Sequence, residues 1–383
     1  MNVLIERWQR ELGMLGRIGR RRALQRPRGV DFTSNDYLAL GAEPVPESWL
    51  REEAFRFWSG TASRLLRGHH PLYEAVEAAL ARWHGAEAVL LFNSGYTANE
   101  GLLSTLIRRG DWVASDELNH ASIIDGLRLA KGERYVFRHN DLDHLEEGLR
   151  AAAARRPADG ALFIVTESIF SMNGDRAPLV ELAGLAARYE AALIVDEAHA
   201  TGCYGPEGQG LVDELGIRSA VLATVHTGGK ALACCGAYVC SSALLRDYLI
   251  NRCRHLIYTT ALPPAVLAAW LWRVRQVAEA GQRRARLHAL ARFFRERLLE
   301  GGVQPLGEAY IVPVVLGDDA RAVAVARRLQ QAGYDVRPIR PPTVPLGTAR
   351  LRLSIHADHD ERLLGAVADV LVAAVRAQHE ATG

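Results

Sequence analysis

From Ala86 to Ser241 the chain alternates short, continuous apolar runs with stretches of helical periodicity. The runs predict strands at residues 88–92, 112–116, 135–137, 161–166, 192–196, 220–224 and 237–241. Residues 72–84, 97–107 and 123–131 read as helices. Fully apolar strands separated by helices are typical of a mostly parallel sheet that helices cover on both faces. The pattern therefore predicts an α/β protein.

The two ends of the chain follow other patterns. Residues 1–25 predict an amphipathic helix that ends in basic residues, and Asp31 begins a short strand that breaks into a polar turn. Beyond Pro264, the sequence predicts a long helical stretch at 265–300, strands at 311–316, 334–337 and 351–355, and helices at 319–332 and 360–378. We therefore expect an N-terminal helix and arm (1–40), a large domain (41–275) and a small C-terminal α+β domain (276–383).

Composition excludes several classes of protein. The 383 residues are 49% apolar and 23% charged, with a net charge of +2, as in an ordinary globular protein without a nucleic-acid partner. The basic segment Arg20–Arg22 reads as a solvated helix face. Five cysteines without zinc spacing predict no metal site and a reducing compartment. No leader and no apolar run of about 18 residues is visible, so we expect a cytoplasmic protein without a membrane span.

One lysine stands out. The chain has 46 Lys plus Arg, but only Lys131 and Lys230 are lysines. Lys230 lies in the small and apolar stretch Thr227–Ala237. Burial lowers the pKa of an ammonium, and the neutral amine is a nucleophile that forms Schiff bases. A lysine left over by codon bias explains this stretch equally well.

Polar clusters follow several predicted strands, where ligands bind in doubly wound sheets. Residues 93–97 join a strand to a helix and would suit a phosphate. Asp196 ends an apolar strand, and His199 follows three residues later. His120 and Ser171 lie in similar turns. Each cluster alone has an ordinary structural explanation, such as a capping aspartate or a core histidine.

Three of these features together match one cofactor. A helix start for the phosphate, a carboxylate for the pyridine nitrogen and a lysine for the aldehyde are what pyridoxal 5'-phosphate requires. A nucleotide-binding enzyme of the doubly wound class would need a glycine fingerprint after its first strand, and the sequence has none there.

The motifs that carry this chemistry resemble those of the α-oxoamine synthases, pyridoxal-phosphate enzymes of fold type I, the aspartate aminotransferase-like fold. The similarity spans residues 30–375 and rests on the motifs Ser34–Leu38, Asp196–Gly202, Thr227–Ala231 and Arg254–Thr260. The resemblance implies a mostly parallel central sheet with a smaller C-terminal α+β domain. It also implies a homodimer with shared active sites.

The resemblance implies a role for each site residue. Lys230 would hold the cofactor as a Schiff base, Asp196 would pair with the ring nitrogen, His199 with the phenolic oxygen, and His120 would stack on the ring. The residues implied near the phosphate are Gly95, Tyr96, Thr227 and, from the other subunit, Thr260. Ser171 would lie near the phenolic oxygen or the substrate. Arg352 and Asn35 would bind the amino-acid substrate.

Within the family, residues 339–345 and 347–353 are similar to the members that join L-alanine to a pimeloyl thioester in biotin biosynthesis. The implied acyl donor is pimeloyl-CoA or pimeloyl-acyl carrier protein. Alternatives are a glycine C-acetyltransferase, a serine palmitoyltransferase-like enzyme, or a non-catalytic relative, although such relatives typically lack the lysine. The chain departs from the family at Tyr73, at Ala233, where glycine is common, and in a short N-terminal segment.

Overall fold

The computed structural model describes residues 2–50 and 53–380, and it divides into two compact units. The large unit comprises Asn35–Ser171 and Arg176–Arg286, and the small unit comprises the N-terminal residues up to Ser34, Met172–Asp175 and the chain from Leu287 onward. The division lies inside a helix at Arg286, eleven residues beyond the expected boundary at 275, and the N-terminal arm groups with the C-terminal region. Each unit is described by itself.

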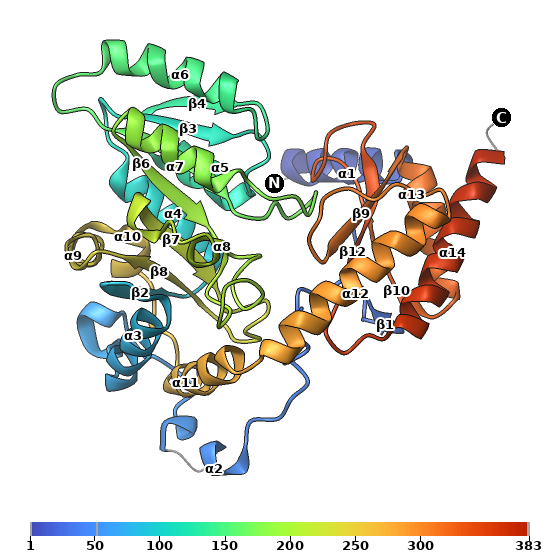
Figure 1. Cartoon of the computed structure of the whole chain (residues 1–383), viewed down its shortest axis with the longest axis horizontal. Coiled ribbons are helices and arrows are strands. Elements are labelled where there is room, and N and C mark those ends of the chain that lie inside the picture. Colours follow the sequence, from blue (N-terminus) through green and yellow to red (C-terminus); the bar gives the residue numbers. More distant parts are fainter. Residues whose placement is uncertain (1, 51–52, 381–383) are drawn as a thin grey trace. The chain divides into compact units, whose positions relative to one another are not determined.

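The large unit is built on a seven-stranded sheet of order β2-β8-β7-β6-β5-β3-β4 (Figure 1). Its strands are β2 (Ala88–Phe92), β3 (Trp112–Asp116), β4 (Glu133–Phe137), β5 (Leu162–Glu167), β6 (Ala191–Asp196), β7 (Val221–Thr227) and β8 (Ala237–Ser241). Only β8 runs against its neighbours, so the prediction of a mostly parallel sheet is confirmed. The predicted strand positions are also confirmed, since fully buried strands carry unbroken apolar runs.

Helices cover both faces of this sheet. Buried leucines and isoleucines of α4 (Gly95–Leu106), α5 (Ala121–Leu129), α9 (Ala243–Arg252) and α10 (Arg254–Ile257) form one apolar core with the strands. On the other face, α6 (Leu142–Arg155) and α7 (Leu179–Arg188) pack against β3–β6. The remaining helices are α2 (Glu47–Leu50), α3 (Pro71–His84), α8 (Leu211–Glu214) and α11 (Pro264–Ala278).

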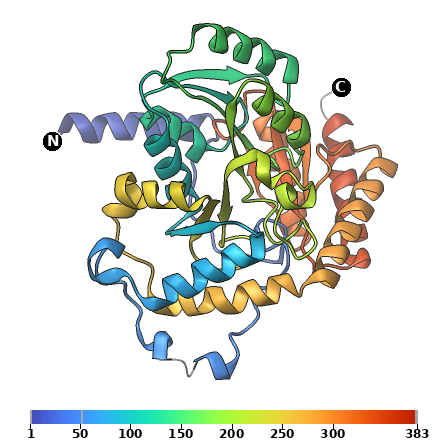
Figure 2. The ribbon, with the colours of Figure 1, turned by 60° about the vertical axis from the view of Figure 1, so that its left-hand side comes forward.

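The small unit has an antiparallel sheet of order β11-β12-β9. Its strands are β9 (Ile311–Gly317), β11 (Pro338–Ile339) and β12 (Ala349–Ser354), and β1 (Val30–Asp31) pairs in parallel with β10 (Tyr334–Asp335). Helices α12 (Gly281–Glu300), α13 (Asp319–Gln331) and α14 (Glu361–Glu380) complete the α+β layer that the sequence predicts. Figure 2 shows α12 through α14 in orange and red.

The N-terminal helix ends earlier than predicted. Helix α1 spans Asn2–Arg17 rather than reaching residue 25. Gly19 adopts a left-handed φ of 67°, and the backbone N–H of Arg20 donates to the carbonyl of Leu15 at 2.8 Å. This glycine cap ends the helix, because only glycine adopts that conformation without steric cost. The three arginines at 20–22 therefore belong to an extended arm.

Two further predictions need correction. The helical stretch at 265–300 is two helices, since the side chain of Arg284 donates to the carbonyls of Val277 and Ala278, the last of α11. The strand expected from Asp31 into the polar turn is only Val30–Asp31. The carboxylate of Asp31 accepts the backbone N–H groups of Thr33 and Ser34 and so turns the chain.

Candidate cofactor site

The candidate site is built at the edge of the large sheet where β2, β3, β5, β6 and β7 end. These strands share one direction, since β2 and β7 both run antiparallel to β8, so the residues that follow them gather at one edge. Most of the residues singled out from sequence lie in these turns. The structure shows which hydrogen bonds and charge interactions these residues make with one another.

Lys230 lies in the loop between β7 and β8. Its side chain is half-buried, while Ala231 and Leu232 beside it are fully buried. It is close enough to His120 to lower the pKa of that imidazole and close enough to Glu167 to act on its carboxyl. The lysine is therefore part of the cluster at this edge.

Asp196 ends β6 with only 6% of its surface exposed. Its carboxylate accepts hydrogen bonds from the side-chain amide of Asn99 at 2.7 Å and from the backbone N–H of Ala198 at 2.8 Å. These two donors fix the direction of the carboxylate. Asn99 is absent from the sequence-based set, although it lies one helical turn after Gly95.

His120 caps the start of α5. Its Nδ1 accepts the backbone N–H of Ser122 at 3.2 Å. Burial lowers the pKa of His120, the charge of Lys230 acts in the same direction, and Asp196 opposes them. A neutral imidazole held by its Nδ1 is suited to lie flat against an aromatic ring.

His199 follows β6 and contacts the N-terminal motif. Its Nδ1 lies 2.7 Å from the hydroxyl of Tyr37, which in turn donates to the side-chain oxygen of Asn35 at 2.9 Å. Tyr37 is fully buried. In the motif Ser34–Leu38 the sequence assigned a role to Asn35 but none to Tyr37, whose hydrogen bond to His199 only the structure shows.

The start of α4 forms a cradle. Ser94 caps the helix by accepting the backbone N–H of Thr97 at 3.2 Å, and a Cβ at Gly95 would lie 3.5 Å from the Cβ of Thr227 at the end of β7. A helix start with backbone N–H groups beside a threonine hydroxyl suits a phosphate. Tyr96 directs its hydroxyl to the carboxylate of Asp125, and its ring stands edge-on to His120.

Three further predicted residues lie on other segments of the chain. Ser171 is half-buried in the turn that follows β5. Thr260 is exposed, and its carbonyl accepts the side-chain amide of Asn93 at 2.8 Å. Arg352 belongs to the small unit, where it is 8% exposed in β12 and donates to Ser354.

Glu167 is a buried carboxyl that the sequence did not assign. It pairs in register with Asp196 on the adjacent strand and accepts the backbone N–H of His120. Within the described residues, its Oε1 has no hydrogen-bond partner. Burial raises the pKa of Glu167 well above its ordinary value, and the charge of Asp196 adds to this shift. This burial therefore favours the protonated form of Glu167.

The residues present fit pyridoxal phosphate. A fixed anion at Asp196, a neutral imidazole at His120, an amine at Lys230 and a helix start at Gly95 are the handles for its ring nitrogen, ring face, aldehyde and phosphate.

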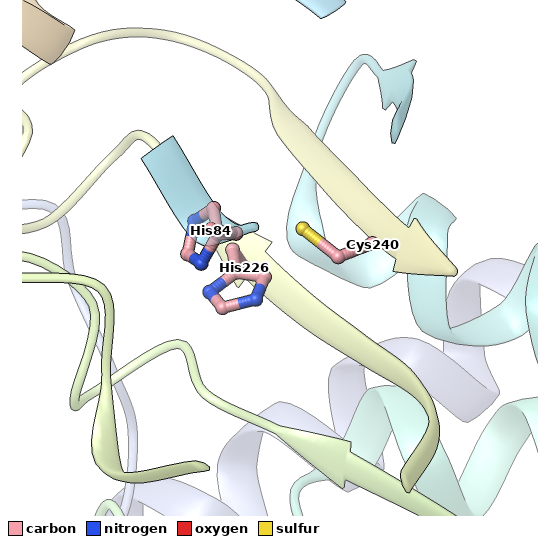
Figure 3. Close-up of side chains that lie close together, drawn as sticks. All are labelled: His84, His226 and Cys240. Carbon is pink, nitrogen blue, oxygen red and sulfur yellow. The ribbon is translucent and has the colours of Figure 1, made fainter. Parts of the chain in front are cut away.

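A second polar cluster lies inside the large unit, formed by His84, His226 and Cys240 (Figure 3). The three side chains are buried, with the sulfur of Cys240 directed toward the two rings. Their spacing could hold a metal ion.

Hydrogen bonds within the protein already use the nitrogens of both rings. His84 contacts Asp213 and Tyr238, and His226 contacts two threonine hydroxyls. Burial lowers the pKa of both histidines and raises the pKa of the Cys240 thiol to about 12. A metal would have to break these bonds and remove the thiol proton, so we interpret the cluster as a polar core contact that joins α3 to β7 and β8.

Comparison with known proteins agrees with this chemistry. The family model described as aminotransferase class I and II matches residues 27–371. An 8-amino-7-oxononanoate synthase of Chlorobaculum parvum is 48% identical over 89% of this chain and 88% of its own length. Another from Halorhodospira halophila is 47% identical over 90% of this chain and 85% of its own length.

Solved structures show the same relationship. A serine palmitoyltransferase of S. paucimobilis with a bound PLP–myriocin adduct has a TM-score of 0.84 and 32% identity, covering 90% of this chain and 87% of its own. An 8-amino-7-oxononanoate synthase of Francisella tularensis has a TM-score of 0.79 and 29% identity, covering 92% and 99%. The expected fold type I is therefore confirmed, and so is pyridoxal 5'-phosphate as the cofactor. The chain belongs to the aminotransferase class I and II family of pyridoxal-phosphate enzymes and, within it, to the α-oxoamine synthases.

Proposed function

We propose that this enzyme condenses L-alanine with a pimeloyl thioester, releasing carbon dioxide and the thiol carrier and giving 8-amino-7-oxononanoate for biotin synthesis. The observation that carries the proposal is the group of Lys230, Asp196 and His120 at one sheet edge, in a chain 48% identical to a relative of that name. The donor is either pimeloyl-CoA or pimeloyl-acyl carrier protein.

The cofactor, when bound, supplies an electron-withdrawing ring that stabilises negative charge at the α-carbon of the amino acid. The Asp196 carboxylate, oriented by Asn99, would keep the ring nitrogen protonated. The Lys230 amine would bind the aldehyde and, once released by the substrate, would accept the α-proton. His120 would cover one ring face and exclude water from it.

The remaining residues would position the ligands. Gly95, Tyr96 and Thr227 would contact the phosphate, and His199 and Ser171 the phenolic oxygen, with Tyr37 fixing the ring of His199. Arg352 and Asn35 would bind the carboxylate of L-alanine, for which a guanidinium offers two parallel donors.

A homodimer with shared sites would cover apolar surface that a single chain exposes. The apolar side of α1 is exposed at Ile5, Trp8 and Leu12, and in the large unit Trp58 and Tyr258 are more than 70% exposed. Such surface marks interfaces. Thr260, two residues beyond Tyr258, would reach the cofactor phosphate of the partner.

The proposed location is the cytoplasm. All five cysteines are free thiols, as expected in a reducing compartment. No helix among residues 2–50 and 53–380 is long and apolar enough to cross a membrane.

The test combines a spectrum with a matched pair of variants. L-alanine should shift the visible absorbance of the holoenzyme more than glycine or L-serine does, and pimeloyl-CoA should then give the amino ketone. Lys230→Ala should lower kcat by at least about a thousandfold, whereas Lys131→Ala, at the only other lysine, should leave it unchanged. A stronger response to glycine or serine would favour another α-oxoamine synthase, and an active Lys230→Ala enzyme would refute the mechanism.

A further inference from the structure

The small unit contains an arginine-lined cavity that the proposed chemistry does not use. Its volume is about 780 Å³, and it lies between the arm at residues 18–25, helix α13 and residues 337–343. Six arginines line it, namely Arg20, Arg21, Arg22, Arg327, Arg337 and Arg340. An adjoining cavity of about 650 Å³ shares Arg327 and Arg337 and adds Arg26 and Arg28.

Hydrogen bonds hold the arm against this part of the small unit. Arg22 donates to the hydroxyl of Thr343 at 2.9 Å, Arg337 donates to the side chain of Gln25 at 2.7 Å, and Arg340 donates to the carbonyl of Gly19. The wall formed by the arm is therefore tied to the wall formed by the C-terminal segments. The arginines face one shared space as a result.

The positive charge of this space is only partly neutralised. Asp319 is the only carboxylate in the lining of the larger cavity, and it pairs with Arg20 at 2.6 Å. Asp335, at the adjoining cavity, pairs with Arg337. Within residues 2–50 and 53–380, Arg21 and Arg327 make neither a hydrogen bond through their side chains nor an ion pair. The chain as a whole carries a charge of only +2, so this surplus is local.

Like charges held around one concave surface repel one another unless an anion lies between them. Guanidinium groups bind phosphate oxygens through paired N–H donors. A volume of 780 Å³ is within the range of small-molecule sites, about 300–1,000 Å³.

We propose that this cavity binds a small organic polyanion with two or more phosphate groups. The ligand comes from one of two sources, the phosphorylated nucleotide end of an acyl-CoA substrate or a free nucleotide that acts as an effector. The site itself does not depend on the proposed function, whereas the assignment to the acyl donor rests on it.

The first measurement is calorimetric titration of the holoenzyme with adenosine 3',5'-bisphosphate, the phosphorylated end of coenzyme A. The double variant Arg21→Gln/Arg327→Gln should weaken binding by at least about tenfold, because it removes two unpaired guanidinium groups. The control Arg17→Gln/Arg328→Gln removes the same charge from α1 and α13 at positions outside both linings and should bind within about twofold of wild type. Absence of binding to the wild type, or equal binding by both double variants, would overturn the proposal.

Kinetics identify the source of the ligand. If the acyl donor occupies the cavity, the Arg21→Gln/Arg327→Gln enzyme should show a raised KM for pimeloyl-CoA but an unchanged KM for the phosphate-free pimeloyl N-acetylcysteamine thioester. Lost nucleotide binding with both KM values unchanged identifies an effector site. If the enzyme lacks synthase activity altogether, the titration still tests the cavity. The proposal would be contradicted if the Arg21→Gln/Arg327→Gln enzyme bound adenosine 3',5'-bisphosphate as the wild type does and lost affinity only for an acidic acyl carrier protein.

Discussion

The Nδ1 of His199 lies 2.7 Å from the hydroxyl of Tyr37, although the two residues are 162 positions apart in the chain. This contact joins the turn after β6 to the segment that leaves the small unit. This hydrogen bond holds the imidazole of His199 through its Nδ1. The buried tyrosine therefore sets the orientation of a residue expected at the phenolic oxygen.

Replacement of Tyr37 by phenylalanine tests this arrangement. The variant keeps the ring but removes the hydroxyl, so we expect kcat to fall by about tenfold and the pH midpoint of the visible absorbance to shift, with little change in KM. A pH titration of the holoenzyme spectrum measures the shift. An unchanged midpoint together with an unchanged kcat would show that Tyr37 has only a packing role.

Asn99 should control the affinity for the cofactor. Asn99→Ala removes the amide that donates to Asp196, and we expect the Kd of pyridoxal phosphate to rise by about tenfold, the equivalent of one charge-assisted hydrogen bond. Fluorescence titration of the apoenzyme gives the Kd. Ser104→Ala is the control in the same helix, since the Ser104 hydroxyl donates to the backbone carbonyl of Glu100 and the bond from Asn99 to Asp196 stays in place. Equal effects of the two substitutions would contradict this assignment.

Glu197 should make stability depend on pH. It accepts the backbone N–H groups of Leu211 and Val212 in a fully buried position, and burial raises its pKa from 4.5 to about 8. Between these two values the folded protein keeps a proton that the unfolded chain releases, so the contribution of Glu197 to stability is lost as the pH rises through this window.

Thermal unfolding at several pH values between about 4.5 and 8 measures the effect. Glu197→Gln should flatten the fall in Tm across this range, because the amide does not titrate. Glu181→Gln, at an exposed position of α7, should leave the pH dependence as in the wild type. The assignment would be wrong if Glu197→Gln kept the full slope.

Ala233, in the loop after Lys230, has a left-handed φ of 47°. A side chain costs about 1–2 kcal/mol in this region, and a β-branched side chain costs more. We expect Ala233→Val to destabilise the enzyme by at least about 1 kcal/mol and Ala233→Gly to be neutral or slightly stabilising, because relief of strain offsets the added backbone entropy. Urea unfolding compares the two variants, and a valine variant as stable as the wild type would argue against strain.

The sequence predicted most of the secondary structure of the large unit for a clear reason. Strands such as Ala88–Phe92 and Ala237–Ser241 are short, mostly apolar runs in a buried sheet, and their length favours a strand over a helix. The prediction failed where local hydrogen bonds override the hydrophobic pattern. Gly19 ends the first helix early, and Arg284 caps α11 within an unbroken helical pattern.

The site residues whose type and sequence context are unusual could be predicted from the sequence. Lys230 is recognisable as one of only two lysines, and Asp196 as a carboxylate at the end of an apolar strand. Asn99 and Tyr37 gave no comparable signal, because buried amides and tyrosine hydroxyls occur throughout protein cores.

The sequence by itself therefore determined the alternation of strands and helices, the family and the cofactor, since these depend on periodicity and on motifs a few residues long. Only the tertiary structure decided that Asn99 holds Asp196 and that Tyr37 orients His199. It also showed that the arginines of the arm line a cavity together with Arg327 of α13, Arg337 and Arg340. Each of these contacts joins segments far apart in the chain, and their meeting is set by packing rather than by local sequence.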